Sequence, residues 1–277
     1  MRVKASVPAR INIIGEHTDH FGGLSLTFSS QHRLVLTASR REKGNRGDQE
    51  IISLWEAAGG WSADLDVDSN IPIGAGLSSS AALCVAIVMC SQKKTDPMEI
   101  SLEAQRIENQ VLCSNCGLMD PISITHSKEG LATLLDFSRM SIEPFRMPED
   151  WRFKLVDTGI RRNLSETNYN SSEIKMETRR RHAEEESARV RMALSSDARA
   201  LGNILNQSHT SISDNIRAST PEIDSMVKEI RNTTGVLGAR LMGGGFGGMI
   251  LALVEEENAI SGDLLASSGP AIFQETL

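Results

Sequence analysis

The sequence predicts a globular protein that combines α-helices with β-strands. Three observations carry this prediction: strand-like segments, one small apolar segment typical of a buried helix, and helix starts marked by a capping residue followed by proline. The 277 residues are 40% hydrophobic and 23% charged, as in ordinary soluble domains. A chain of this length has room for one large or two modest domains.

The overall charge argues against a general nucleic-acid-binding surface. The formal net charge is −7 and the pI is near 5.5, whereas such surfaces are basic. An anionic substrate therefore needs a local cationic pocket. Residues 1–8 lack the apolar segment of a signal peptide, and no run is long and apolar enough to span a membrane. We therefore expect a cytoplasmic protein with no membrane partner.

The four cysteines do not form a convincing metal site. Cys113 and Cys116 make one C-x-x-C pair, but a zinc site wants a second pair, and Cys84 and Cys90 lie in an apolar helical pattern. We therefore expect the cysteines to be small buried hydrophobic residues, as in reduced cytoplasmic proteins.

In chain order, the first elements are strands with polar side chains between them. Residues 3–7 and 31–40 predict strands. Between these strands, a polar cluster precedes a Gly-Gly turn and consists of Arg10, Asn12, Glu16, His17 and Asp19. The cluster is either the polar rim of a hairpin or a grip for a polyhydroxyl ligand, which needs both donors and acceptors. The structure of residues 51–68 stays open.

A glycine- and serine-rich stretch at residues 71–80 precedes the apolar helix predicted over residues 81–89. Two glycines let the backbone turn tightly, and three serines follow. A glycine-rich loop that opens a helix presents N–H groups and a positive dipole end to an anion. The combination favours a phosphate site over a plain serine cap. It is not a Walker loop, because no Gly-Lys-Ser/Thr follows the glycines.

Helix starts and short strands alternate through the rest of the chain. Asp96-Pro97 predicts a helix that carries Glu108 at the edge of its apolar stripe, and Thr220-Pro221 predicts another helix. Further strands are expected at residues 130–136 and 153–156, further helices at 173–192 and 199–209, and a boundary at 144–148. The helix at 173–192 is so charged that we expect much of it to face solvent.

A second glycine-rich stretch lies near the end of the chain. Gly243, Gly245 and Gly248 formally satisfy the G-x-G-x-x-G pattern of dinucleotide sites. That pattern needs a helix after it, but residues 249–254 predict a strand. We therefore expect a glycine loop that packs against another loop close to a phosphate, and not an NAD site.

Five stretches in order along the chain resemble the GHMP kinases, the family named for galactokinase, homoserine kinase, mevalonate kinase and phosphomevalonate kinase. Residues 72–81 resemble the family's ATP-phosphate motif, and residues 241–248 resemble its C-terminal glycine motif. Residues 10–19 (Arg-Ile-Asn-Ile-Ile-Gly-Glu-His-Thr-Asp) are similar to the signature of the galactokinase branch, as are residues 116–120 and 161–170.

The resemblance implies an α+β protein with the two-domain GHMP kinase fold. The N-terminal domain, residues 1–148, would resemble ribosomal protein S5 domain 2, and the C-terminal domain, residues 149–277, would be ferredoxin-like. ATP and sugar would meet in the cleft between them. The implied reaction is phosphoryl transfer from ATP, with Mg²⁺, to the anomeric hydroxyl of a sugar, which is galactose in the galactokinase branch.

The resemblance also implies residue roles. Asp120 matches the carboxylate that takes the proton of the sugar hydroxyl, and Arg10 matches its ionic partner, which steadies the phosphoryl group. The positions that match the ATP loop are Gly74, Ala75, Gly76, Leu77, Ser78, Ser79 and Ser80. The positions that match the Mg²⁺ ligands are Ser80 (or Ser79) and Glu108. The positions that match the sugar site are Glu16, His17, Asp19, Gly117 and Tyr169.

Some of these roles have simpler alternatives. Glu108 is alternatively a solvated helix residue, and Asp120 is alternatively a turn cap before Pro121. We interpret His17 as a hydrogen-bonding or packing group and not as an acid or base. Arg161 is interpreted equally well as a phosphoryl contact or as a surface residue.

The sequence departs from the galactokinase pattern around the expected sugar pocket. His20 stands where Tyr is common, Pro121 where Gln is common, and Ser25-Leu26-Thr27 replaces a stretch that commonly ends Leu-Pro. Kinases of arabinose, an N-acetylhexosamine or a heptose therefore stay as alternatives, and a non-catalytic sugar and ATP sensor is the rival from another class. The presence of every implied catalytic residue favours an enzyme. We expect only small-molecule partners, sugar and ATP, and a monomer or weak oligomer.

Overall fold

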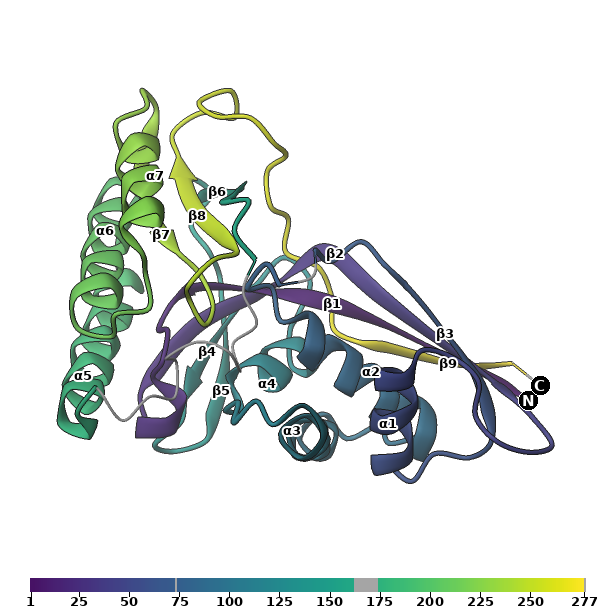
Figure 1. The fold of residues 1–277 in the computed structure, drawn as a ribbon. Coiled ribbons are helices and arrows are strands. Elements are labelled where there is room, and N and C mark those ends of the chain that lie inside the picture. Colours follow the sequence, from purple (N-terminus) through teal and green to yellow (C-terminus); the bar gives the residue numbers. More distant parts are fainter. Residues whose placement is uncertain (73, 162–173, 277) are drawn as a thin grey trace.

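The computed structural model describes residues 1–72, 74–161 and 174–276, whose strands form two antiparallel sheets (Figure 1). In the first sheet the order is β5-β4-β2-β1-β9, and β3 also pairs with β2. The pairing of β1 with β2 shifts register between Pro8 and Arg10 and between Asn12 and Ile14. Such irregularities redirect side chains and are common beside active sites. The strands of this sheet are β1 (Arg2–Ile14), β2 (Leu24–Arg40), β3 (Ala63–Ser69), β4 (Ala132–Asp136), β5 (Ser141–Phe145) and β9 (Ile272–Thr276).

Four helices lie together on one side of the first sheet (Figure 1). α2 packs against β1 and β2, and every residue from Ala81 to Cys90 is buried. A helix that is apolar all round belongs in a core, so the predicted buried helix is confirmed. The four helices are α1 (Gln49–Ala57), α2 (Ser79–Gln92), α3 (Pro97–Leu112) and α4 (Met119–Thr125).

The second sheet has the order β6-β8-β7. α6 and α7 pack against β7, while α5 packs against α6 and also reaches β1 and β2 (Figure 1). Among the residues that the structure describes, no helix is long and apolar enough to cross a membrane. The elements of this part are β6 (Arg152–Asp157), α5 (Met176–Ala193), α6 (Ala198–Asp214), α7 (Pro221–Arg231), β7 (Val236–Leu241) and β8 (Met249–Val254).

Side-chain caps begin two helices where the sequence predicts them. Asp96 accepts a hydrogen bond from the Glu99 N–H at the start of α3, and Thr220 accepts one from the Ile223 N–H at the start of α7. Both predicted starts are confirmed. α2 differs, because the side chain of Ser78 makes no capping hydrogen bond to it. The first-turn N–H groups of α2 are therefore not satisfied by their capping residue.

Parts of the fold differ from the sequence predictions. The first strand runs past residue 7 to Ile14, because Arg10 and Asn12 are buried within it and do not interrupt it. α5 is as charged as predicted, yet it buries a face that includes His182 and Glu186. Residues 51–68, which the sequence left open, complete α1 and form most of β3, and β9 was not predicted.

The cysteines are only partly in the predicted environment. Cys84 and Cys90 are buried in α2, and burial raises the pKa of the Cys90 thiol to about 12. Cys113 is exposed and Cys116 is half-buried, so the expectation of burial is wrong for this pair. The reason is that α3 ends at Leu112, and Cys113 turns the chain outward in a left-handed conformation with φ of 51°.

The chain passes from the first sheet to the second between β5 and β6, next to the boundary expected at residues 144–148. β9 then pairs with β1 and so belongs to the first sheet. The first sheet is therefore built from both ends of the chain, and no single point separates its strands from those of the second sheet. The division into residues 1–148 and 149–277 stays a prediction.

α6 and β7 approach each other backbone to backbone through two glycines. A Cβ atom on Gly202 would lie 2.3 Å from the carbonyl oxygen of Leu237, and one on Gly238 would lie 2.2 Å from that of Gly202. We expect Gly202→Ala to lower the free energy of unfolding by about 1–3 kcal/mol through overpacking, although alanine favours helix by about 1 kcal/mol. Urea denaturation measures the change.

Asn203→Ala is the matched control, because Asn203 is exposed on the same turn of α6. We expect this variant to stay within about 0.5 kcal/mol of the wild-type protein. A Gly202→Ala protein that is as stable as the wild type would mean that the close approach of α6 and β7 is not required.

Candidate active site

Arg10 and Asp120 form an ion pair between β1 and the first turn of α4. Nε of Arg10 donates to Oδ1 of Asp120 at 2.7 Å, and Nη2 donates to the same oxygen. Burial by itself lowers the pKa of Arg10, but the Asp120 and Glu16 carboxylates raise it above its ordinary value. A buried, permanently charged guanidinium therefore faces the carboxylate that the sequence assigns as the base.

The glycine-serine loop is tied directly to this ion pair. Ser78 Oγ donates to the second carboxylate oxygen of Asp120, Oδ2, at 2.6 Å. Arg10 donates from Nη1 to the Gly76 carbonyl and from its backbone N–H to the Leu77 carbonyl, both at 3.3 Å. Ser78 adopts a left-handed conformation with φ of 60°, which is strained for serine and directs its hydroxyl to Asp120.

The two glycine-rich stretches pack against each other, as the sequence predicts. A Cβ on Gly76 would lie 2.7 Å from the Met242 carbonyl oxygen, and the Met249 N–H donates to the Ala75 carbonyl at 3.0 Å. Gly74 and Gly76 have φ of 66° and 72°, where glycine is unstrained. β8 follows the second stretch, so no helix follows these glycines as a dinucleotide site requires.

Ser80 and Glu108 face each other from α2 and α3. Ser80 Oγ donates to Oε1 of Glu108 at 2.7 Å. Glu108 is buried, and this burial raises the pKa of its carboxyl group to about 7. A buried carboxylate next to a hydroxyl is a fitting place for a hard cation, which would stabilise the charged form. Ser79 is the first residue of α2, between Ser78 and Ser80.

A cavity beside the ion pair gathers most of the residues assigned to the sugar. Its lining consists of Arg10, Glu16, His17, Asp19, Cys116, Gly117, Met119, Asp120, Gly243 and Gly244. A Cβ on Gly117 would coincide with the Asp19 carboxylate, at 1.8 Å from Oδ2. Burial, followed by the nearby Asp120, raises the pKa of Asp19. Burial lowers the pKa of His17 to about 3, so its imidazole is neutral near pH 7.

Arg161, which the sequence left as a phosphoryl contact or a surface residue, does not line this cavity. Tyr169 lies outside the described residues. Arg161 is partly exposed and forms a bidentate ion pair with Asp157, at 2.7 and 2.6 Å. The space for a Cβ on Gly74 lies 3.2 Å from Cδ of Arg161, so this arginine borders the outer side of the glycine-serine loop.

Arg240 is a site residue that the sequence reasoning did not single out. It lies fully buried on β7 and donates to the carbonyls of Ile13 and Asn12, at 2.9 and 2.5 Å, and to Oε1 of Glu16 at 3.2 Å. The Gly243 N–H also donates to this carboxylate oxygen, at 2.6 Å. The sequence does contain a signal for it, because Arg240 is a charged residue in an otherwise apolar strand just before a glycine-rich stretch.

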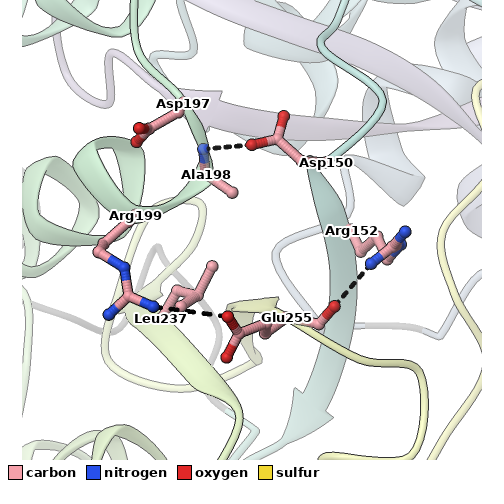
Figure 2. A pocket seen from close by; sticks show the side chains of 7 residues that line it. All are labelled: Asp150, Arg152, Asp197, Ala198, Arg199, Leu237 and Glu255. Carbon is pink, nitrogen blue, oxygen red and sulfur yellow. Dashed lines mark hydrogen bonds and ion pairs between the residues drawn. The ribbon is translucent and has the colours of Figure 1, made fainter.

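Another cavity, shown in Figure 2, is lined by residues of β6, α6 and β7 and by their flanking segments. Its charged groups are already engaged: Asp150 accepts from the Ala198 N–H, Arg152 donates to the Glu255 carbonyl, and Arg199 pairs with the Glu255 carboxylate. None of the residues assigned to catalysis or binding lines it. This cavity is therefore not part of the candidate active site.

Solved structures with the same fold cover nearly the whole chain. Lactococcus lactis galactokinase complexed with galactose is 23% identical, with a TM-score of 0.81 over 98% of this chain and 95% of that one. L. major mevalonate kinase in complex with R-mevalonate is 17% identical, with a TM-score of 0.72 over 96% of both chains. A D-glycero-D-manno-heptose 1-phosphate kinase from Bacteroides thetaiotaomicron is 14% identical, with a TM-score of 0.68 over 99% of both chains.

Three family models match different parts of the sequence. The GHMP kinases N-terminal domain matches residues 49–128, the GHMP kinases C-terminal model matches residues 190–262, and the galactokinase galactose-binding signature matches residues 2–40. These matches confirm the predicted α+β fold class with its two GHMP kinase domains. The chain belongs to the GHMP kinase family and carries that family's galactokinase signature in its first two strands.

Proposed function

We propose that this protein transfers the γ-phosphoryl group of ATP to the anomeric hydroxyl of galactose. One observation carries the proposal: the Arg10–Asp120 ion pair contacts both the cavity and the glycine-serine loop. Glu16, His17 and Asp19 border the cavity on one side, and the Gly76–Ser78 backbone and hydroxyl border the pair on the other. Donors and acceptors for a sugar and the loop proposed to hold phosphate thus meet at one carboxylate.

Asp120 is the base in this proposal. It takes the proton of the anomeric hydroxyl while that oxygen bonds to the γ-phosphorus, and the bond from phosphorus to the ADP oxygen breaks. Arg10 and Ser78 hold the two carboxylate oxygens in fixed positions, and the Arg10 charge stabilises the equatorial oxygens of the transferring group. The reaction needs mainly positioning and charge neutralisation, which is what these groups offer.

Mg²⁺ fits the Ser80–Glu108 pair. The pair offers a hydroxyl and a buried carboxylate whose pKa is raised to about 7. Within the described residues no group of three or more His, Cys, Asp or Glu converges as a metal cage. This suits Mg²⁺, which binds through one or two carboxylates and takes its other ligands from phosphates and water. Bound there, it would neutralise phosphate charge.

A sugar panel tests the proposal. The purified protein is mixed with Mg-ATP and, in separate reactions, with galactose, arabinose, N-acetylgalactosamine, N-acetylglucosamine, a heptose and glucose, and ADP release is followed. We expect galactose to give the highest kcat/KM. A different preferred sugar would replace galactose but keep the reaction class. Release of ADP with none of them, from protein that binds both ligands, would point to a sensor instead.

We expect Asp120→Asn to lower kcat by about a thousandfold, within the range that a positioned base contributes. The amide keeps an acceptor for Arg10, so the fold is retained. Steady-state kinetics and far-UV circular dichroism check both statements. Asp64→Asn is the control, because Asp64 forms a partly exposed ion pair with Arg41 outside the candidate site and should keep kcat within about twofold. Near-normal turnover by Asp120→Asn would mean that another group is the base.

We expect Glu108→Gln to change both activity and the pH dependence of stability. Because burial raises the pKa of Glu108 from 4.5 to about 7, its ionisation destabilises the fold progressively as the pH rises through that window. Without Mg²⁺ and nucleotide, the variant should therefore gain stability over the wild type at about pH 8 and not at about pH 4. Thermal unfolding at both pH values measures the difference.

The same variant should lose most of its Mg²⁺-dependent turnover. Glu103→Gln, on the same helix but paired with Arg106, should show neither effect. An equal stability change at the two pH values would show that the Glu108 carboxyl does not titrate in this window.

A further inference from the structure

The buried face of α5 holds the main chain of the sugar loop, which we define as residues 15–24. His182 Nε2 lies 3.2 Å from the Glu16 carbonyl oxygen, Glu186 Oε1 accepts from the Gly15 N–H at 3.2 Å, and Ser187 Oγ accepts from the Leu24 N–H at 3.0 Å. Glu186 and Ser187 lie four and five positions after His182, and all three residues are on the buried side of α5. Figure 1 shows α5 beside the end of β1 and the start of β2.

Glu186 has an environment suited to a fixed acceptor. Its side chain is fully buried, and it also accepts from Ser208 Oγ and from Arg189 Nε, both at 2.6 Å. Burial raises the pKa of Glu186, but the Arg189 and Arg240 guanidiniums and the Ser208 hydrogen bond contribute to lowering it below its ordinary value. The group is therefore a carboxylate at neutral pH, with one oxygen directed to Gly15.

His182 is hydrogen-bonded to the Glu16–His17 peptide group in a defined protonation state. Burial lowers the pKa of His182, so the ring is neutral near pH 7. A carbonyl oxygen only accepts, which means that Nε2–H donates to the Glu16 carbonyl and Nδ1 accepts from Ser211 Oγ, 2.8 Å away. α5 thus holds two peptide groups on either side of the Gly15–Glu16 peptide: the Ile14–Gly15 group through its N–H and the Glu16–His17 group through its carbonyl.

The sugar loop needs such support because its backbone is strained. Gly15 has φ of 107°, and His17 has φ of 59°, in the left-handed region that side chains other than glycine disfavour. A conformation of this kind persists only where surrounding contacts impose it. Glu16 lies between these two residues, so their conformation decides where its carboxylate and the side chain of Asp19 lie.

We propose that Glu186 is a positioning residue for sugar binding: it fixes the Gly15 peptide and thereby aims Glu16, His17 and Asp19 into the cavity. The inference rests on the proposed function of that cavity. It adds a residue of α5, in the C-terminal half, to a sugar site whose matched signature covers only residues 2–40. The ATP loop has no contact with Glu186 in this scheme, so its effect is confined to the sugar.

The test is Glu186→Met, which keeps the volume of the side chain and removes the acceptor of the Gly15 N–H. We expect the KM for the sugar to rise at least about tenfold, the factor equivalent to about 1.4 kcal/mol. The KM for ATP should stay within about twofold, because the ATP loop is untouched. The matched control is Glu103→Met on α3, where Glu103 pairs with Arg106 at the same i, i+3 spacing as Glu186 with Arg189.

Amide hydrogen exchange without any substrate gives an independent readout. In Glu186→Met we expect faster exchange in residues 15–24 and unchanged exchange in α2 and β8, whereas Glu103→Met should leave the sugar loop unchanged. If Glu186→Met does not fold, Ser187→Ala replaces it. This variant removes the acceptor of the Leu24 N–H, together with a hydrogen bond that Ser187 donates within α5 to the Ala183 carbonyl. We expect the same selective rise in sugar KM, by about threefold.

The two readouts separate this inference from the proposed function. Faster exchange of the sugar loop in a protein whose wild type phosphorylates no sugar would leave the positioning role intact and remove the proposed reaction. Turnover by the wild type with unchanged exchange and unchanged sugar KM in the variant would overturn the positioning role. Equal increases in the KM for sugar and for ATP would also overturn it, since they would indicate a general structural defect.

Discussion

A guanidinium group buried between the two sheets holds the molecule together at its active site. Arg240 reaches from β7 to the carbonyl groups at the end of β1 and to the Glu16 carboxylate. A buried charge of this kind is tolerated only where hydrogen bonds and an opposite charge compensate its lost hydration, and removal of one partner from such a pair costs about 3–5 kcal/mol. The relative position of the sheets and the position of Glu16 are therefore set by the same group.

Backbone atoms make further close contacts at this junction of the two sheets. Gly76 and Gly243 lie so close that neither has room for a side chain, and the Gly243 N–H completes the hydrogen bonding of Glu16. On the first-sheet side, Ser78 connects the glycine-serine loop to Asp120, the proposed base. The glycine-serine loop and the cavity beside Asp120, proposed to hold phosphate and sugar, are consequently linked through short, directional bonds.

The sequence predicts those parts of the site whose chemistry is local. The glycine-serine loop stands out because its motif is contiguous, whereas the roles expected of Glu108 and Asp120 come from the resemblance to the GHMP kinases. Glu186 does not stand out, since its partner Gly15 is 171 positions away. Its helix is also strongly charged, and the apolar residues on its buried side, such as Ala183 and Val190, are few and small. The same holds for Arg10 and Asn12, whose charge and polarity suggested an interrupted strand, although the ion pair with Asp120 lets β1 continue through Arg10.

The return of β9 to the first sheet has a mechanical consequence. The second sheet and its helices are joined to the first sheet by two covalent crossings, one between β5 and β6 and one between β8 and β9. A body attached at two separate points cannot swing freely like a domain on a single tether. The two crossings differ in length, because six residues separate β5 from β6 and seventeen separate β8 from β9, so the shorter one limits the relative movement of the two parts more strongly.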